Sequence, residues 1–325
     1  MTEDDLISLI ANLADRPAAD VIIGIGDYAA VVDVPHGKSL VSCTDTLVSG
    51  VHFPAGTPAF SVGFKSLAVN LSDMAAMAAT PRWAQLSLTL PAIDEEWIEG
   101  FFAGFLALAD RYNVALIGGD TCAGPLSITV QLLGVADGNT ILRRGAASVG
   151  DLIAVSGWLG DAALALSLIK RAETVDPDLL KKLDEPEPRV ELGQKLAGIA
   201  SSCIDISDGL MLDLERLLQR SGYGARLEIV KLPASDFLAG LTEDERWEFQ
   251  LGGGDDYELC FSVPPGRLPQ LEETISTVEV PVNIIGEVTA SPGISCYDAV
   301  GTAVQLKSTG FQHFKYSDES GIESS

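Results

Sequence analysis

Aspartates occur in this sequence at positions where a carboxylate is unusual. Asp73 lies within residues 67–77, a predicted helix that is apolar on almost every side. Because such a helix is normally buried, its carboxylate must be paired or must bind a metal ion. Other aspartates follow β-rich or glycine-rich segments, and these are Asp27, Asp45, Asp120, Asp205 and Asp208.

Carboxylates that converge on one site cannot remain together without counter-charges. Two unit charges about 4 Å apart repel by about 4 kcal/mol at an effective dielectric constant near 20. Magnesium relieves this repulsion, since it binds one or two carboxylates together with waters and substrate phosphates. The pattern therefore predicts a magnesium-assisted site for a phosphorylated substrate, although spacing alone does not show that the aspartates meet.

The net charge of the chain supports the same chemistry. The 325 residues carry a formal charge of −25, with 46 acidic and 21 basic side chains. Such a surface repels nucleic acid and anionic membranes. It also repels a nucleotide, unless bound cations invert the local charge. We expect neither a nucleic-acid partner nor a membrane partner.

Several aspartates also have an ordinary structural interpretation, which the sequence leaves open. Asp27 and Asp120 follow glycines and suit turns. Asp208 precedes Gly209 and an amphipathic run, so it suits the N-cap of a helix. Asp73 has a candidate ion-pair partner in Lys65, which lies two helical turns earlier.

Two familiar nucleotide-binding motifs fail their structural test. Residues 24–29 fit the loose dinucleotide fingerprint, but a predicted strand follows where the motif needs a helix. Residues 37–39 resemble the end of a phosphate-binding P-loop, yet position 32 is valine instead of glycine and a strand follows again. ATP, if bound, is held in another way.

Glycines at 118–119 and 252–254 would let backbone approach a ligand closely, and Arg143 and Arg144 could clamp phosphate.

Strands and helices alternate in both halves of the chain, which predicts α+β or α/β domains. Helices are expected over 2–13, 59–79 and 94–111, with Asp94 as an N-cap, and strands over 21–25, 29–34, 40–42, 82–91, 114–117 and 126–135. Asp45 is expected at the end of its strand. The second half is expected to contain helices 161–170, 189–200 and 209–221, further helices after the strand at 225–230, and strands 152–156, 203–206, 225–230, 257–263, 282–288 and 303–307.

Length and composition indicate two domains, which we place at 1–149 and 150–314, followed by a flexible tail, 315–325. The acidic N-terminus does not resemble a signal peptide, and no long apolar run follows it. The five cysteines form no C-x-x-C pair and the three histidines are far apart. We therefore expect a cytoplasmic protein without disulfides or structural zinc.

Seven motifs in a fixed order, together with the C-terminal segment, resemble the thiamine-monophosphate kinase family, part of the ATP-binding superfamily that includes aminoimidazole-ribonucleotide synthetase. They are Gly-Ile-Gly-Asp (24–27), Thr-Asp-Thr-Leu-Val (44–48), Gly-Val-His-Phe (50–53), Lys-Ser-Leu-Ala-Val-Asn-Leu-Ser-Asp (65–73), Ile-Gly-Gly-Asp-Thr (117–121), Ile-Asp-Ile-Ser-Asp-Gly-Leu (204–210), Gly-Gly-Asp-Asp-Tyr-Glu-Leu (253–259) and the final Gly-Phe-Gln-His-Phe (310–314).

The resemblance implies a two-domain fold of the aminoimidazole-ribonucleotide synthetase type, with N-terminal sheets paired across a homodimer. It implies direct in-line transfer of a phosphoryl group from ATP to thiamine monophosphate, with several Mg²⁺ ions and room for a K⁺ ion. The implied metal ligands are Asp27, Thr44, Asp45, Asp73, Asp120, Asp205 and Asp208. The implied ATP contacts are Gly119, Asp120, Arg144 and Ser207, and the implied substrate contacts are His52, Asp255 and Phe311, with Phe311 stacking on a ring.

Three positions depart from the family pattern. Tyr28 stands where the family has a metal-binding aspartate, and a phenol with a reference pKa near 10 is a poor magnesium ligand. Asp255 replaces a glutamate that is one methylene longer, and Cys43 replaces a serine or threonine. Two alternatives therefore stay open: a catalytically weakened or inactive nucleotide-binding homologue, and a sibling ATP-dependent synthetase.

Overall fold

The computed structural model describes residues 2–16, 18–304 and 310–311. The expected tail, 315–325, and the end of the expected strand 303–307 lie outside these ranges. No helix within them is both long enough and apolar enough to cross a bilayer. The N-terminal half contains α1 (Glu3–Leu13), β1 (Val21–Ile23), β2 (Val31–Val32), β3 (Ser39–Val48), α2 (Ala59–Ala76), β4 (Thr80–Leu90), α3 (Glu95–Tyr112), β5 (Ala115–Ala123) and β6 (Ser127–Ala136).

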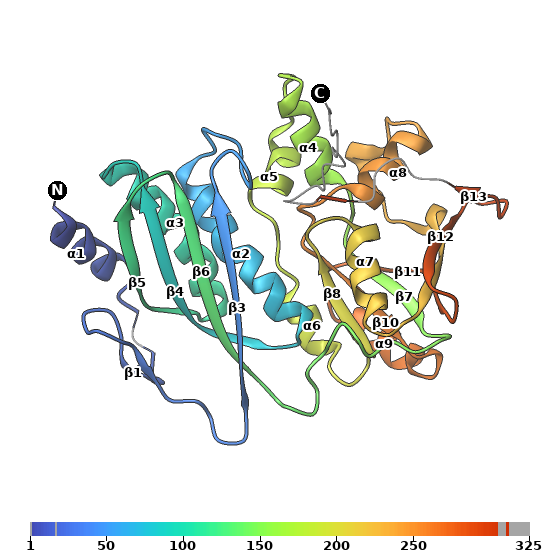
Figure 1. Cartoon of the computed structure of the whole chain (residues 1–325), viewed down its shortest axis with the longest axis horizontal. Helices are drawn as coiled ribbons and strands as arrows, with labels where there is room; N and C mark the ends of the chain where they lie inside the picture. Colours follow the sequence, from blue (N-terminus) through green and yellow to red (C-terminus); the bar gives the residue numbers. More distant parts are fainter. Residues whose placement is uncertain (1, 17, 305–309, 312–325) are drawn as a thin grey trace, which may run out of the picture.

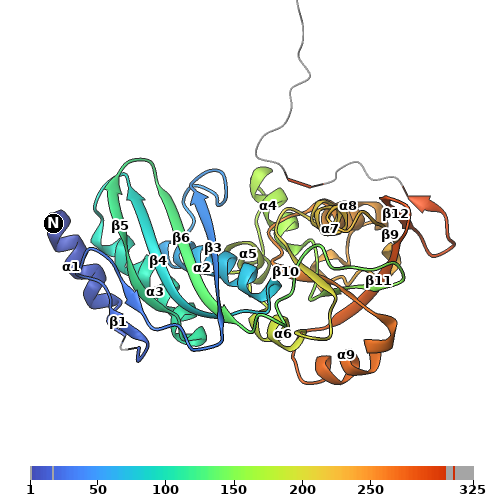
Figure 2. The same ribbon diagram turned by 60° about the horizontal axis from the view of Figure 1, so that its bottom comes forward.

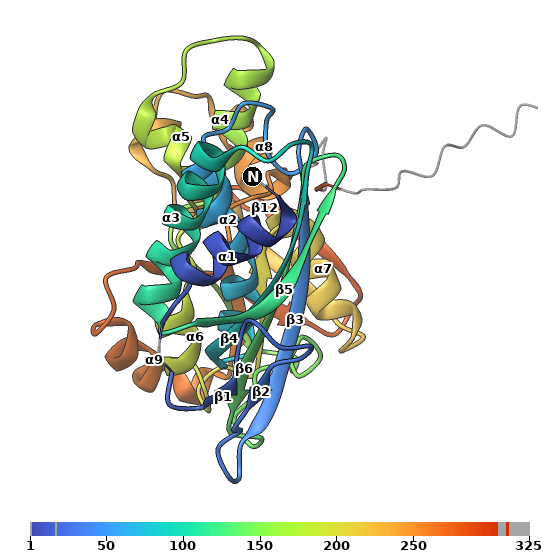
Figure 3. The ribbon, with the colours of Figure 1, turned by 90° about the vertical axis from the view of Figure 1, so that its left-hand side faces the viewer.

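The first large sheet has the strand order β3-β6-β4-β5, so β3 and β5 are its two edges. Helices α2 and α3 cover one of its faces (Figure 3), and inward residues such as Leu86, Leu88 and Val130 are buried there. Side chains alternate along each strand. The register therefore aligns an outward row of polar residues across all four strands: Thr46, Thr129, Ser87 and Asp120.

Two expected strand ends are wrong. Asp45 lies inside β3 and Asp120 lies inside β5, because pairing with β6 and β4 continues past both residues. An aspartate does not have to end a strand, because its side chain can point away from one face of the sheet while its backbone stays paired. The two strands that were expected to follow the failed nucleotide motifs, β2 and β3, are confirmed.

Helix α2 is buried between the two halves of the molecule (Figure 1). Fourteen of its eighteen residues are buried, as its apolar sequence predicted. Its residues share one hydrophobic core with the first sheet and with Leu259, Phe261 and Cys203 of the second half. The helix that carries Lys65 and Asp73 is therefore the common centre of both halves.

The second half is built on a seven-stranded sheet of order β13-β12-β9-β11-β7-β10-β8, which is antiparallel except where β12 meets β9. Helices α7 and α8 lie on one side of it and α6 and α9 on the other (Figure 2). The strands are β7 (Leu152–Ser156), β8 (Ser202–Ile206), β9 (Gly224–Glu228), β10 (Glu258–Val263), β11 (Val282–Thr289), β12 (Gly293–Tyr297) and β13 (Ala303–Val304).

The helices of this half are α4 (Asp161–Lys170), α5 (Pro177–Asp184), α6 (Val190–Lys195), α7 (Leu210–Gln219), α8 (Glu243–Gly252) and α9 (Leu268–Ile275). The sequence-based expectations did not include α5 or β12, and they made α6 too long. The signal for α5 is Asp176, whose side chain caps the helix, followed by Pro177 at its first turn.

Helices α2 and α3 approach closely through glycines. A Cβ atom on Gly104 would lie 1.8 Å from the carbonyl oxygen of Phe60, and one on Gly63 would lie 1.9 Å from that of Phe101. Backbone atoms cannot move aside as a flexible side chain can. This contact fixes the position of α2 against the first sheet.

We predict that Gly104→Ala lowers the free energy of unfolding by about 1–3 kcal/mol or more, because the added methyl group overpacks the helix interface. Gly100→Ala on the same helix is the control, since the nearest atom to its Cβ would be the Cβ of Ala59 at 3.1 Å, and the nearest backbone atom, Phe60 N, would lie at 3.9 Å. Urea denaturation measures both. Equal stabilities of the two variants would contradict the close contact.

Candidate active site

A cavity of about 1210 Å³ lies where the two halves meet. Its wall combines β3, α2, the loop after β8, the loop before β10 and the segment that ends at Phe311. Most of the predicted site residues line it, and they are Thr44, Asp45, His52, Asp73, Asp205, Ser207, Asp208, Asp255 and Phe311. Residues separated by more than 250 positions along the chain therefore share one cavity.

Three of these carboxylates influence one another electrostatically. Burial raises the pKa of Asp73 to about 8, and the charges of Asp205 and Asp45 add to the rise. Burial also raises the pKa of Asp45 and that of Asp205. The positive charge of Arg144 acts in the opposite direction on the pKa of Asp73 and of Asp205. The predicted convergence is thus found for Asp45, Asp73 and Asp205.

The oxygen ligands in this cavity suit magnesium better than a metal ion whose ligands all come from the protein. Within the described ranges, no three histidine, cysteine, aspartate or glutamate side chains are grouped as a metal-binding cluster. Magnesium does not need one, because it retains waters and takes substrate phosphates as ligands. Carboxylates whose pKa values are raised by burial and mutual repulsion are the groups that a cation would stabilise.

Asp27, Gly119 and Asp120 do not line this cavity. They line a second one of about 760 Å³, on the side of the sheet where β5 lies, and Thr44 borders both cavities. Asp120 shares its outward row with Thr46 but lies three strands away, which is roughly 14 Å at the usual spacing of strands. One chain alone does not bring all seven predicted metal ligands together.

The loop after β8 is held by a carboxylate that the sequence analysis did not identify. Asp213 Oδ2 accepts hydrogen bonds from the backbone N–H groups of Ser207, Asp208 and Gly209, at 3.0, 2.9 and 3.1 Å. Arg216 joins Asp213 Oδ1 to Asp208 Oδ2. Asp208 is therefore not the N-cap of α7, and that alternative is wrong.

The open alternative for Lys65 is also wrong. The Lys65 ammonium lies 2.8 Å from Asp255 Oδ1 instead of pairing with Asp73. A separation of eight residues places Lys65 and Asp73 two turns apart along α2, so each meets a different part of the second half. His52 accepts a hydrogen bond at Nδ1 from Val48 N at 3.0 Å, which orients its ring at the cavity wall.

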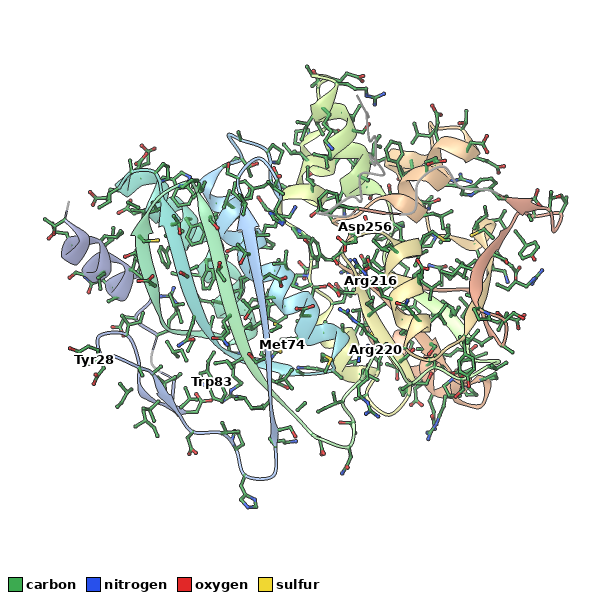
Figure 4. All side chains as sticks on the ribbon, in the orientation of Figure 1. Tyr28, Met74, Trp83, Arg216, Arg220 and Asp256 are labelled. Carbon is green, nitrogen blue, oxygen red and sulfur yellow. The ribbon has the colours of Figure 1, made fainter. Side chains whose placement is uncertain are left out.

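The two departures near the metal ligands have different surroundings. Tyr28 is fully exposed and lies at the outer edge of the N-terminal half, far from Arg216 and Asp256 (Figure 4). Cys43 is half-buried, with Sγ 3.5 Å from the Asn70 carbonyl oxygen. Burial, with the charge of Asp73, raises the pKa of its thiol. In the absence of a bound cation, this shift favours the protonated thiol of Cys43 at neutral pH.

Comparison with known proteins adds independent information. Residues 26–136 match the family described as AIR synthase related protein, N-terminal domain, and residues 148–299 match its C-terminal domain. Thiamine-monophosphate kinase of Escherichia coli (strain K12) is 42% identical over 318 residues, which cover 94% of this chain and 97% of that protein.

Solved structures agree. Thiamine-monophosphate kinase from Stenotrophomonas maltophilia K279a superimposes with a TM-score of 0.82 at 42% identity, covering 90% of this chain and 94% of the other. The structure of AaThiL complexed with AMPPCP and TMP superimposes with a TM-score of 0.76 at 29% identity, covering 96% and 97% of the two chains.

The raised pKa of Asp73 predicts how metal-free stability depends on pH. The pKa of this carboxyl group rises on folding, from 3.8 to about 8. Such a group contributes most to the stability of the folded protein at pH values below its pKa in the unfolded chain. That contribution is lost as pH rises through the folded value. The metal-free protein should therefore melt at lower temperature as pH rises from 6 to 9. Asp73→Asn should remove part of this fall, by roughly 1–2 °C for each kcal/mol of repulsion relieved in a chain of this length.

Thermal melts in a chelator, with and without added Mg²⁺, measure this effect. Mg²⁺ should raise the melting temperature of the wild type most at high pH, where Asp73 is ionised. Asp33→Asn, at an exposed site, is the control. If the melting curves of Asp73→Asn followed those of the wild type at every pH, Asp73 would not be the destabilising group.

Proposed function

The chain belongs to the thiamine-monophosphate kinases, a family of AIR synthase related proteins, and we infer that the cavity between its two sheets carries out their reaction. That reaction is the transfer of a phosphoryl group from ATP to thiamine monophosphate. The fold is accordingly the two-domain AIR synthase type. The observation that carries the conclusion is 42% identity to a thiamine-monophosphate kinase over nearly the whole chain.

A related structure contains both kinds of substrate at once. AMPPCP and TMP are bound in AaThiL, which is 29% identical to this chain. AMPPCP is an analogue of ATP, so ATP is the co-substrate we assign here. The same relatives disfavour the two alternatives, an inactive homologue and a sibling synthetase. The direct test is incubation with ATP, Mg²⁺ and thiamine monophosphate, in which thiamine diphosphate should form.

We propose that Thr44, Asp45, Asp73, Asp205 and Asp208 hold magnesium ions in this cavity. Bound Mg²⁺ would neutralise phosphate charge and orient the phosphates for transfer. The support is the mutual repulsion of Asp45, Asp73 and Asp205 in a partly dehydrated wall. Arg144 and Ser207 would contact ATP, since the Arg144 charge already acts on the same carboxylates. A K⁺ ion in the cavity remains part of the proposal.

The transfer itself needs positioning more than proton removal. A phosphate oxygen of thiamine monophosphate attacks the γ-phosphorus, a new P–O bond forms, and the bond to the bridging oxygen of ADP breaks. The attacking phosphate has a second pKa near 6 and is largely ionised at pH 7. It therefore needs no strong general base. His52, Asp255 and Phe311 would hold the acceptor in line, with Phe311 stacking on a ring.

A second copy of the chain would complete the site. Asp27, Gly119 and Asp120 belong to a different cavity from the other proposed ligands. A two-fold axis pairs the same face of both copies, so sheets packed through their outward polar rows would bring the β5 edge of one chain toward the β3 edge of the other. We propose this homodimer, in which Asp27 and Asp120 of one chain serve the cavity of its partner.

Two further assignments follow the same reasoning. We propose domains of 1–149 and 150–314, supported by family matches that end at 136 and resume at 148. We propose a cytoplasmic location, supported by five cysteines that are all free thiols.

We predict that Asp45→Asn and Asp120→Asn each reduce kcat by at least ~100-fold while the protein stays folded, because each would remove a charge that holds metal and polyphosphate. Thiamine diphosphate formation measures turnover, and circular dichroism checks the fold. Asp33→Asn should leave the rate unchanged. A near-normal rate in either variant would remove that residue from the metal site.

Mixing the two variants tests the shared site. If Asp45 and Asp120 act across the dimer, each parent dimer is inactive at both sites. A heterodimer of Asp45→Asn with Asp120→Asn would carry both defects in one site and none in the other. Random reassembly of an equal mixture makes half of the dimers heterodimers, so mixing after mild dissociation should restore about a quarter of the wild-type activity. No recovery on mixing would mean that both residues act within one chain.

We predict that Tyr28→Asp lowers the Mg²⁺ concentration at half-maximal rate, because carboxylate oxygens are the side-chain ligands that magnesium prefers. Tyr28→Phe is the matched control and should behave as the wild type. Magnesium titrations of the rate compare the three proteins. Identical curves for Tyr28→Asp and the wild type would show that position 28 does not contribute to metal binding.

A further inference from the structure

Lys65 is a buried lysine that reaches both halves of the molecule at the cavity. Its side chain is 2% exposed, and its ammonium lies 2.8 Å from Asp255 Oδ1. The same ammonium donates a hydrogen bond to the carbonyl oxygen of His52 at 3.3 Å. His52 belongs to the N-terminal half and Asp255 to the second half. We have proposed that both residues contact thiamine monophosphate.

A third group, the carboxylate of Asp184, also lies within the electrostatic influence of Lys65. Asp184, at the end of α5, is buried. Burial raises its pKa, and the positive charge of Lys65 opposes that rise. Its Oδ1 atom has no hydrogen-bond partner within the described structure. Lys65 therefore compensates two carboxylates in a region largely closed to water, where a lone charge would be very unfavourable.

The loop that carries Asp255 needs such support. Asp255 and Tyr257 have φ angles of +67° and +50°, in the left-handed region that residues with a side chain rarely adopt. Their N–H groups donate to the carbonyl oxygens of Ser207 and Ile206, each at 2.8 Å. The Tyr257 hydroxyl donates to Asp255 Oδ1 at 3.3 Å. These contacts hold the backbone, and the Lys65 pair holds the carboxylate.

We propose that Lys65 is a positioning residue for the acceptor substrate. It fixes the Asp255 carboxylate and the His52 segment at a set separation, so that thiamine monophosphate meets a preformed subsite. Lys65 and Tyr257 both contact Oδ1 of the Asp255 carboxylate. The Asp255 side chain remains 27% exposed at the cavity wall. The short side chain of Asp255 suits this role, because it lies within direct reach of Lys65. The proposal rests on the kinase function inferred above.

The test separates the two substrates kinetically. Lys65→Met should raise KM for thiamine monophosphate by about 10- to 100-fold, the range expected for loss of a hydrogen bond to a charged group. KM for ATP should change less than twofold, because the hydrogen bond and the ion pair found for Lys65 in the described part of the chain go to His52 and Asp255, and not to the residues that we assign to ATP or metal. Lys231→Met is the control, since Lys231 forms a comparable but exposed ion pair with Glu228, and it should change neither KM.

A double-mutant cycle asks whether Lys65 acts through Asp255. Asp255→Asn alone should raise KM for thiamine monophosphate, and adding Lys65→Met should raise it little further. Independent effects that multiply would overturn the proposal. So would a Lys65→Met variant with unchanged KM for thiamine monophosphate, or with equal increases for both substrates.

Removing the lysine leaves buried carboxylates without a counter-charge, so Lys65→Met alone could fail to fold. The double variant also removes the Asp255 charge, and Lys65→Gln keeps a hydrogen-bond donor. If Lys65→Met is not folded, Lys65→Gln replaces it in the cycle, with a smaller increase expected and the same outcomes overturning the proposal. A wild-type protein that makes no thiamine diphosphate would overturn the kinase function, and this proposal with it.

Discussion

Repulsion among partly buried carboxylates is the constraint on which this site depends. Asp45, Asp73 and Asp205 come from three separate elements, and each has its pKa raised by burial. Folding thus brings together charges that would separate if they were free to do so, and the hydrophobic contacts of α2 hold them in place. With the magnesium ions that we propose for this site, the same arrangement would explain how a chain with a net charge of −25 accepts two phosphorylated substrates, since such cations would reverse the sign of the local potential.

The manner of phosphate binding also follows from a local detail. The N-terminus of a helix usually offers free N–H groups to a phosphate. At α7, the three N–H groups of residues 207–209 are already taken by Asp213, which Arg216 holds in turn. These three N–H groups, which directly precede α7, are therefore not available to a phosphate. This agrees with the proposal that cations and scattered side-chain contacts hold the nucleotide.

Features that depend on local pattern could be predicted from the sequence, and features that depend on pairing could not. The all-round apolar pattern of residues 67–77 predicted the buried α2 with its exceptional Asp73. The sequence carries no comparable record of strand order, so it could not reveal that Asp120 lies three strands from Thr46. The partner of Lys65 was also missed, because Asp255 is 190 positions away. In the sequence Asp213 is an ordinary residue of a predicted helix. Its contacts with the preceding loop are visible only in the folded structure.

The position of α2 has a consequence for how the molecule can be taken apart. One hydrophobic core runs from the first sheet through α2 to β8 and β10, so each half depends on the other to bury part of its apolar surface. The second half also has a core of its own, formed by residues between Ala147 and Cys296. A fragment ending near residue 149 would present the apolar back of α2 to solvent, and a fragment beginning there would expose the inner face of its sheet. The shared core thus couples the two halves, so that loosening α2 in one half would also weaken the packing of the other.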